Sequence, residues 1–214
     1  MTGVRALVVE NDSFTLASLV SALEYQRVEV VGRATTAREA LELQRDTTPN
    51  VALLDLDLGV GPTGVDLAHA LRIRQPEIGL VMLSTYHDPR LIAPGMVTPP
   101  RGTTYLNKAD IRDFSEIVVQ VLVAARTPLA FRSAVPSSLR PLTEGQIDVL
   151  RLVADGMSTQ AIAEERQVSV KAVEQTISRL SEVLDVPRDS STNQRVQLAR
   201  AYLELAGKIP ESER

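Results

Sequence analysis

The chain of 214 residues contains no cysteine and no tryptophan, and aromatic residues make up only 3% of it. Without cysteine it has no disulfide framework, no thiolate nucleophile and no cysteine metal ligands. No apolar run approaches the roughly 18 residues that a membrane span needs, and no charged-then-apolar segment at the N-terminus predicts export. These absences favour a cytoplasmic protein without membrane contact.

Histidine is almost as scarce, since the chain holds only His69 and His87. Isolated histidines are more often surface or core residues than ligands or bases, and no Ser-His-Asp or metalloprotease pattern is present. We therefore do not expect an enzyme. With 44% hydrophobic and 23% charged residues, the chain can form one large or two modest globular domains.

The first 125 residues alternate short apolar runs with helical patterns, which predicts an α/β fold with a doubly wound, parallel, five-stranded sheet. Between the last two strands, residues 88–100 hold four prolines and a glycine, so any helix there should be short, kinked or absent. The expected strands are Val4–Val9, Val28–Val31, Val51–Leu54, Ile78–Leu83 and Thr103–Leu106, and the expected helices are Ser13–Gln26, Thr36–Arg45, Gly64–Arg74 and Asp110–Ala125.

Residues 126–141 contain three prolines and three serines and lack an amphipathic period, which indicates an interdomain linker. Residues 142–210 read as four helices. Thr143, Ser158 and Ser169 are the expected N-caps of the first three, which end near residues 155, 166 and 184. Two short helices joined by a tight turn, the second longer, are typical of a helix-turn-helix DNA reader.

The fourth of these helices, about Thr192–Ala206, has two apolar faces. One face is enough for a core, so the second predicts either a dimer contact or burial on both sides. The first face consists of Val196, Ala199, Leu203 and Ala206, and the second of Leu198, Tyr202 and Leu205.

The run from Val51 to Gly64 delivers two carboxylates, Asp55 and Asp57, from a buried strand into a glycine-rich loop. Ligand sites in open α/β sheets form where such strands end, and an unpaired buried carboxylate costs several kcal/mol. The loop also matches G-x-G-x-x-G, a weak signal for dinucleotide binding. Pro62 removes one N–H from a phosphate cradle and the two carboxylates would repel a pyrophosphate, so a cation-binding loop fits better.

Two stretches carry a family resemblance. The segment Leu142–Leu180, LTEGQIDVLRLVADGMSTQAIAEERQVSVKAVEQTISRL, resembles the NarL/LuxR-type (FixJ-like) four-helix DNA-binding domain over about 60 residues. The first 125 residues resemble a response-regulator receiver domain of the flavodoxin-like type, with LVVEND at the first strand, Asp55 after the third, Ser84 after the fourth and Lys108 after the fifth. The implied order is receiver domain 1–125, linker 126–141 and helix-turn-helix domain 142–210.

The resemblance implies that Asp55 is a phosphoacceptor whose donor is a histidine kinase. Lys108 would pair with the phosphoryl oxygens, Ser84 would supply a hydroxyl to them, and Tyr105 would be the aromatic whose rotamer follows that bond. Each has a structural alternative: Ser84 as a strand-end cap, Tyr105 as a core ring and Lys108 as a surface charge. The proline-broken connection replaces the helix of the face that typically changes on activation.

Mg²⁺ prefers oxygen ligands, and the available set is Glu10, Asn11 or Asp12, Asp55, and the backbone carbonyl of Asp57. Receivers usually carry two adjacent acids where this chain has Glu10 and Asn11. The neutral side chain should weaken Mg²⁺ binding: a loss of about 1.4 kcal/mol lowers affinity about tenfold, unless Asp12 or Asp57 compensates. A phosphate-independent pseudo-receiver therefore stays open as an alternative.

The DNA-binding half is not basic, because residues 138–214 contain ten Lys or Arg against twelve Asp or Glu. The local face of the recognition helix matters more than net charge. Lys171 and Arg179 would hold phosphates, Gln175 could read adenine, and Glu174 could accept from cytosine or repel the backbone, with Ser178 on the same face. The alternative is a solvated helix face. Weak half-sites would need a homodimer to bind promoter DNA usefully.

The sequence thus predicts a two-component transcriptional response regulator in which phosphorylation of Asp55 controls dimerisation and promoter binding. The rival from another class is a nucleotide- or small-molecule-binding α/β protein whose helical tail mediates protein contacts.

Overall fold

The computed structural model describes residues 3–92, 97–130, 142–186 and 193–208. The chain forms two compact units, residues 1–84 with 97–134, and residues 85–96 with 135–214. Nothing in the sequence pattern predicted that residues 85–96 would group with the C-terminal helices. Residues 131–141, most of the predicted linker, lie outside the described residues.

The first unit is built on a parallel five-stranded sheet in the order β2-β1-β3-β4-β5, which confirms the predicted fold class. All residues of β3 and β4 are buried, as expected for central strands covered on both faces. The strands are β1 (Arg5–Val9), β2 (Glu29–Ala34), β3 (Val51–Asp55), β4 (Gly79–Ser84) and β5 (Thr103–Asn107).

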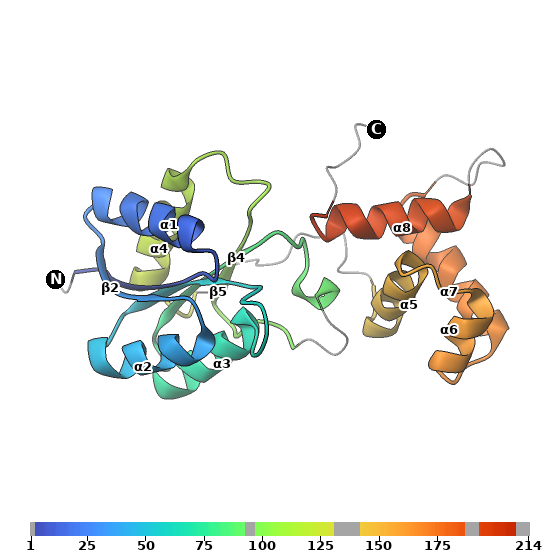
Figure 1. Cartoon of the computed structure of the whole chain (residues 1–214), viewed down its shortest axis with the longest axis horizontal. Coiled ribbons are helices and arrows are strands. Elements are labelled where there is room, and N and C mark those ends of the chain that lie inside the picture. The colour runs from blue at the N-terminus through green and yellow to red at the C-terminus, as the bar shows by residue number, and fades with distance from the viewer. Residues whose placement is uncertain (1–2, 93–96, 131–141, 187–192, 209–214) are drawn as a thin grey trace. The chain divides into compact units, whose positions relative to one another are not determined.

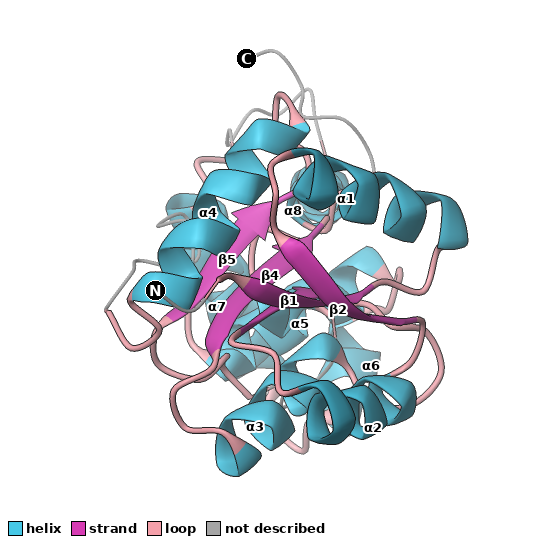
Figure 2. Cartoon of the chain, turned by 90° about the vertical axis from the view of Figure 1, so that its left-hand side faces the viewer, coloured by secondary structure: helices cyan, strands magenta, loops and turns pink. Residues whose placement is uncertain are grey.

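Two helices cover each face of this sheet. Helices α1 (Ser13–Tyr25) and α4 (Phe114–Arg126) lie on one face, and α2 (Ala37–Thr47) and α3 (Gly64–Arg74) lie on the other (Figure 2). The side chains of α1 and α4 form one apolar cluster with those of β1, β3 and β4. The layers leave the carboxyl ends of the strands, where the site residues lie, at one edge of the sheet.

Side-chain caps fix where these helices begin. The carboxylate of Asp12 accepts from the backbone N–H of Thr15 at 2.7 Å and starts α1. Thr63 and Asp66 form a reciprocal capping box at α3. Asp113 caps α4, so that helix begins at Phe114 rather than at the expected Asp110.

The proline-rich connection between β4 and β5 contains a single turn of 3₁₀ helix, η1 (Pro89–Leu91), among its described residues. This agrees with the expectation of a short helix or none. Asp88 caps the turn by accepting from the backbone N–H of Arg90 at 2.9 Å.

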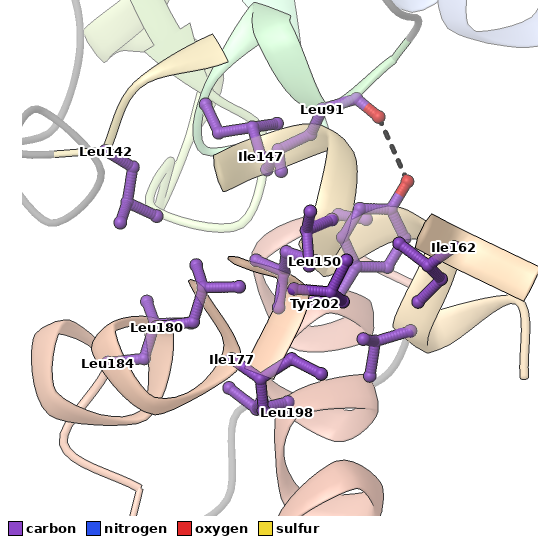
Figure 3. Close-up of a cluster of buried hydrophobic side chains, with 14 of the residues drawn as sticks. Leu91, Leu142, Ile147, Leu150, Ile162, Ile177, Leu180, Leu184, Leu198 and Tyr202 are labelled. Atoms are coloured by element: carbon purple, nitrogen blue, oxygen red, sulfur yellow. Dashed lines mark hydrogen bonds between the residues drawn. The ribbon is translucent and has the colours of Figure 1, made fainter. Parts of the chain in front are cut away.

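The C-terminal part of the second unit consists of α5 (Glu144–Ala154), α6 (Thr159–Glu165), α7 (Val170–Val183) and α8 (Gln194–Leu205) (Figure 1). Thr143, Ser158 and Ser169 cap the first three as the sequence predicts. The buried side chains of all four helices pack in one core (Figure 3), which contains Ile147, Leu150, Ile162, Ile177, Leu180, Leu184, Leu198 and Tyr202.

Helix α8 buries the second of its two predicted apolar faces most deeply. Leu198 and Tyr202 are 0% and 5% exposed, whereas Val196 on the other face is 61% exposed. Ala206, at the C-terminal end of that other face, is buried as well. None of the helices in the described ranges combines the length and the apolar character that crossing a membrane would require.

Candidate functional site

The parallel sheet brings four predicted site residues to the same edge. Asp55 is the last residue of β3 and Ser84 the last of β4, while Glu10 and Lys108 directly follow β1 and β5. In register, Asp55 lies opposite Leu83 and Ser84 opposite Asn107. Residues separated by up to 98 positions in the sequence therefore meet because parallel strands end together.

The centre of the site is one ammonium shared by two carboxylates. Lys108 Nζ lies 2.9 Å from Glu10 Oε2 and 3.0 Å from Asp55 Oδ1. Glu10 and Asp55 are only 2% and 6% exposed, so both charges are largely withdrawn from water. One cation thus compensates two buried anions, and the cluster carries a net negative charge if both carboxylates are ionised.

This imbalance perturbs the acid–base properties of the cluster. The pKa of Asp55 is raised to about 6, chiefly because the carboxyl is buried; the Lys108 ammonium opposes this effect and the Glu10 carboxylate adds to it. Burial lowers the pKa of Lys108, but the carboxylates of Asp55 and Glu10 outweigh it and hold that pKa above its ordinary value. Lys108 is therefore a permanent cation, and Asp55 is an anion above about pH 6.

Ser84 and Tyr105 are both buried in the neighbouring strands β4 and β5. Ser84 is 1% exposed, and its backbone carbonyl accepts from the Lys108 N–H at 2.7 Å. Tyr105, on β5, is 7% exposed. These positions suit the roles that the resemblance implies, and the roles themselves stay predictions.

The remaining acids near the site are engaged by their own loops. Asp12 caps α1, and its hydrogen bonds from the Thr15 backbone and hydroxyl hold the pKa of its carboxyl below the usual value. Asp57 Oδ1 accepts from the Gly59 N–H at 3.1 Å. Asn11 is exposed. Because Asp12 and Asp57 are engaged in these local hydrogen bonds, neither takes the place of the second carboxylate that Asn11 lacks.

The oxygen atoms at this site are of the type that binds Mg²⁺, but they carry fewer negative charges than a site with two adjacent acids would. Glu10 and Asp55 offer hard carboxylate oxygens, which this ion prefers. Within the ranges that the structure describes, no group of three or more acidic, histidine or cysteine side chains is placed to hold a metal ion. A magnesium ion here would depend on neutral oxygens and water for its other ligands.

The three glycines after β3 have conformational reasons to be glycine. Gly59 and Gly61 have φ values of +79° and +121°, which other residues adopt at a cost. At Gly64 a Cβ would collide with the backbone carbonyl of Asp55. That third glycine lets α3 begin against the end of β3, so turn geometry and close packing explain the G-x-G-x-x-G match without a nucleotide.

The predicted DNA-reading residues lie on the solvent side of α7. Lys171, Glu174, Gln175 and Arg179 are exposed and Ser178 is half-buried. The opposite side of the helix is buried in the core through Val173, Ile177 and Leu180. The serine at position 169 caps the helix by accepting from the Ala172 N–H at 3.2 Å. The structure therefore places these residues together on the side of α7 that faces away from the core.

Two contacts were missed by sequence reasoning. The first is the Glu10–Lys108 ion pair, since Lys108 was expected either to pair with phosphoryl oxygens or to be a surface charge. The second is the docking of residues 85–91 in the helical unit. The convergence of strand ends could have suggested the ion pair. No sequence signal pointed to the docking, because prolines predict only that a helix is absent.

Two family models match the chain. Residues 6–109 match the response regulator receiver domain, and residues 140–199 match the bacterial regulatory proteins of the luxR family. The two matches occur in the order that the sequence predicts. The first runs from β1 past the end of β5 and includes residues 85–96 of the second unit, and the second lies in the C-terminal part of that unit.

Curated relatives span nearly the same length. The chain is 27% identical over 186 residues to the transcriptional regulatory protein DesR of Bacillus subtilis, covering 86% of this chain and 91% of that protein. It is 28% identical over 193 residues to the transcriptional regulatory protein MctR of Rhizobium johnstonii, covering 86% and 88%.

Solved structures share the fold. A structure of two RcsB dimers bound to two parallel DNAs matches with a TM-score of 0.60 at 18% identity, covering 95% of this chain and 99% of that one. RcsB from Salmonella enterica serovar Typhimurium bound to promoter rprA matches with a TM-score of 0.54 at 16% identity, covering 94% and 98%. The structures support the fold, while the two family matches and the curated relatives show that the chain belongs to the LuxR-type response regulators, which join a receiver domain to a luxR-family DNA-binding domain.

Proposed function

We propose that the chain is a cytoplasmic transcriptional regulator of a two-component system, in which a histidine kinase phosphorylates Asp55 and thereby controls homodimerisation and promoter binding. One observation carries the receiver half of this proposal: Lys108 Nζ bonds both Glu10 and Asp55 at the strand ends. A buried nucleophile beside a fixed cation is the arrangement that phosphoryl transfer to a carboxylate requires.

The chemistry follows from the charges. A carboxylate oxygen of Asp55 forms a bond to phosphorus while the bond from phosphorus to the donor atom breaks, and the leaving group keeps that electron pair. The ionised carboxylate is a far better nucleophile than the protonated acid, so the raised pKa of Asp55, about 6, should make the reaction slower as the pH falls below that value. Lys108 neutralises charge that accumulates on the phosphoryl oxygens, and the Ser84 hydroxyl can donate to one of them.

The proposal includes a weak Mg²⁺ site held by Glu10, Asp55, the Asn11 side chain and the Asp57 backbone carbonyl. Bound there, the ion would supply further charge neutralisation to the phosphoryl group. Because Asn11 is neutral, this chain depends more on Lys108 for that neutralisation than a receiver with two adjacent acids does.

The DNA half is proposed to read a promoter with α7. Lys171 and Arg179 contact phosphates, and Gln175 can form paired hydrogen bonds with adenine. Glu174 lies between Lys171 and Arg179 in the sequence of α7, and its negative charge limits non-specific attraction to the DNA backbone. Three of the similar structures are of RcsB bound to DNA, which supports this assignment. A homodimer would double the contacts and compensate for the acidic helical unit.

A second candidate is a regulator with the same DNA-binding half but a receiver that works without phosphate. The neutral Asn11 beside Glu10 favours it, since the position that normally adds a second metal-binding charge is lost. The nucleotide-binding rival is disfavoured because packing and turn geometry account for the glycine loop.

Incubation with acetyl phosphate and Mg²⁺, followed by intact mass measurement, tests the proposal. We expect one added phosphoryl group on the wild-type chain and none on Asp55→Asn. The matched control is Asp57→Asn, which alters the exposed acid two residues further on and should still be modified. An unmodified wild-type chain would support the phosphate-independent receiver instead.

A further inference from the structure

A pocket of about 810 Å³ lies between α2, α3 and the loop that joins β3 to α3. The two helices pack together on the same face of the sheet (Figure 2), so the pocket belongs entirely to the first unit. It is separate from the strand-end cluster, because Glu10, Asp55 and Lys108 do not line it. Its volume is typical of sites that hold drug-sized molecules.

Apolar side chains from all three elements make up most of the lining of this pocket. All but Pro62 in the following set are buried or half-buried against the rest of the fold, so they form a fixed surface. Such a surface favours a ligand that removes it from water. The set consists of Ala37 and Leu41 on α2, Leu67 and Ala70 on α3, and Leu58 and Pro62 in the loop.

Val60 also lines the pocket but is fully exposed in the middle of the loop. Glycines with positive φ values flank it, +79° at Gly59 and +121° at Gly61. The two ends of the loop are held together, because the Leu56 carbonyl accepts from the Gly64 N–H at 2.9 Å. The glycines allow the middle of the loop to adjust, so a ligand in the pocket would cover a valine that water now surrounds.

Hydrogen-bond donors lie at the end of the pocket where α2 begins. The guanidinium of Arg38, in the first turn, is exposed and has no hydrogen bond or ion pair with any residue in the described ranges. The hydroxyl of the N-cap Thr36 accepts from the Glu39 N–H at 3.3 Å, which leaves its own proton for another acceptor. The N-terminus of this 11-residue helix also favours an anion.

The acidic side chains nearby do not cancel this positive end. Among the described lining residues Asp66 is the one acid, and its Oδ2 already accepts from the N–H and the hydroxyl of the α3 N-cap at 2.9 and 2.8 Å. The Glu39 carboxylate accepts from the Thr35 N–H at 2.8 Å, and Glu42 does not line the pocket. The pocket therefore combines an apolar surface with one unpaired cation, Arg38.

We propose that this pocket binds an organic acid, a molecule with a drug-sized apolar body and one carboxylate. The carboxylate accepts from the Arg38 guanidinium and the Thr36 hydroxyl, and the apolar body covers Leu67 and Val60. A neutral molecule of the same shape leaves Arg38 without an acceptor, and an ammonium meets it with like charge. The site gives the receiver unit a chemical input that requires no phosphoryl donor and no reaction at Asp55.

An NMR titration of the full-length chain with 1-naphthoate tests this site. We expect saturable shifts of the backbone amide resonances of Arg38, Gly59 and Ala70. Two probes with the same rings, the neutral 1-naphthamide and the cation 1-naphthylmethylammonium, should each bind about tenfold more weakly. A wild-type chain without saturable shifts at these amides would overturn the proposal, and so would tighter binding of the ammonium than of the carboxylate.

Exposed side chains allow the charge contact to be removed without disturbing the core. Arg38→Gln should weaken 1-naphthoate about tenfold and leave 1-naphthamide unchanged. Arg45→Gln is the matched control, because Arg45 lies on the same helix, is exposed and does not line the pocket; it should change neither affinity. Equal 1-naphthoate affinities of the two arginine variants would overturn the assignment of a carboxylate ligand.

The apolar contact is tested at the loop. Val60→Asn should weaken 1-naphthoate and 1-naphthamide alike, each about threefold. Val119→Asn is its control, because Val119 is 52% exposed on α4, which covers the other face of the sheet. Equal affinities of the two valine variants would overturn the part that the loop plays in the site.

Lys108 is another cation that an acid could reach, and Asp55→Asn distinguishes the two places. This variant removes one of the two carboxylates that Lys108 bonds, so it should strengthen an acid that binds at the strand ends and leave the α2 pocket unchanged. Tighter binding of 1-naphthoate to Asp55→Asn than to the wild type would overturn the proposal. The titration needs no phosphorylation, so this proposal and the proposed function fail separately.

Discussion

Replacing Asp55 by asparagine should stabilise the folded receiver, although it removes half of an ion pair. The pKa of Asp55 is raised from 3.8 to about 6, first by burial and then by Glu10. The folded state therefore binds a proton more tightly than the unfolded state. Such a group contributes stability that is fully present below about pH 4 and is lost as the pH rises through 6.

The magnitude follows from the size of the shift. At 1.36 kcal/mol for each pKa unit, ionised Asp55 costs about 3 kcal/mol of folding free energy at pH 8. Asparagine has nearly the same shape as the protonated carboxyl and carries no charge. The free energy of unfolding of Asp55→Asn should thus exceed that of the wild type by about 3 kcal/mol at pH 8. At pH 5 the difference should be roughly half as large, because Asp55 is already protonated in much of the folded wild type.

Urea denaturation followed by circular dichroism, at pH 5, 6, 7 and 8, measures this difference. Asp57→Asn is the control, because Asp57 is exposed and its side chain accepts from the Gly59 N–H of its own loop; the pH-dependent gain should be specific to Asp55→Asn. A stability gap for Asp55→Asn that is constant between pH 5 and 8, or a wild type more stable at pH 8, would refute the reasoning about burial.

Other perturbations follow from the same contacts. Lys108→Gln leaves Glu10 and Asp55 without their cation, so it should lower the free energy of unfolding by about 3 kcal/mol and raise the pKa of Asp55 further. A carbon-13 NMR titration of the Asp55 carboxyl measures that pKa, and an unchanged value would disprove the prediction. Asn11→Asp restores the second acid and should tighten Mg²⁺ binding about tenfold by calorimetry, and equal affinities would show that residue 11 is not a ligand. In a mobility-shift titration, Lys171→Ala and Arg179→Ala should each reduce the slope of log affinity against log salt concentration by about one phosphate contact. An unchanged slope would show that these α7 residues do not contact DNA phosphates.

The sequence was sufficient for the fold because each element carries its own local signal. Buried strands such as Val51–Asp55 read as apolar runs, and the caps Thr63, Thr143 and Ser169 mark helix starts by their chemistry. Boundaries that depend on a single cap were less certain. Helix α4 begins after the Asp113 cap rather than at the expected Asp110, and both aspartates are of a residue type that can cap a helix.

The sequence predicts which residues lie at the candidate site, but not which carboxylates form ion pairs with Lys108. Strand ends place Asp55, Ser84 and Lys108 together, yet which carboxylate takes the ammonium depends on side-chain reach across three strands, and the structure shows that both do. The docking of Leu91 under Tyr202 was beyond sequence reasoning, because a non-local contact leaves no periodic pattern in either segment.

If phosphorylation of Asp55 controls promoter binding, a DNA titration of the modified and unmodified protein must show it. Fluorescence anisotropy of the chain's own promoter DNA should be measured with the protein before and after treatment with acetyl phosphate and Mg²⁺, with intact mass recording the modified fraction. We predict tighter binding that scales with that fraction and is absent in Asp55→Asn. Identical affinity of the fully modified and unmodified protein would contradict the account.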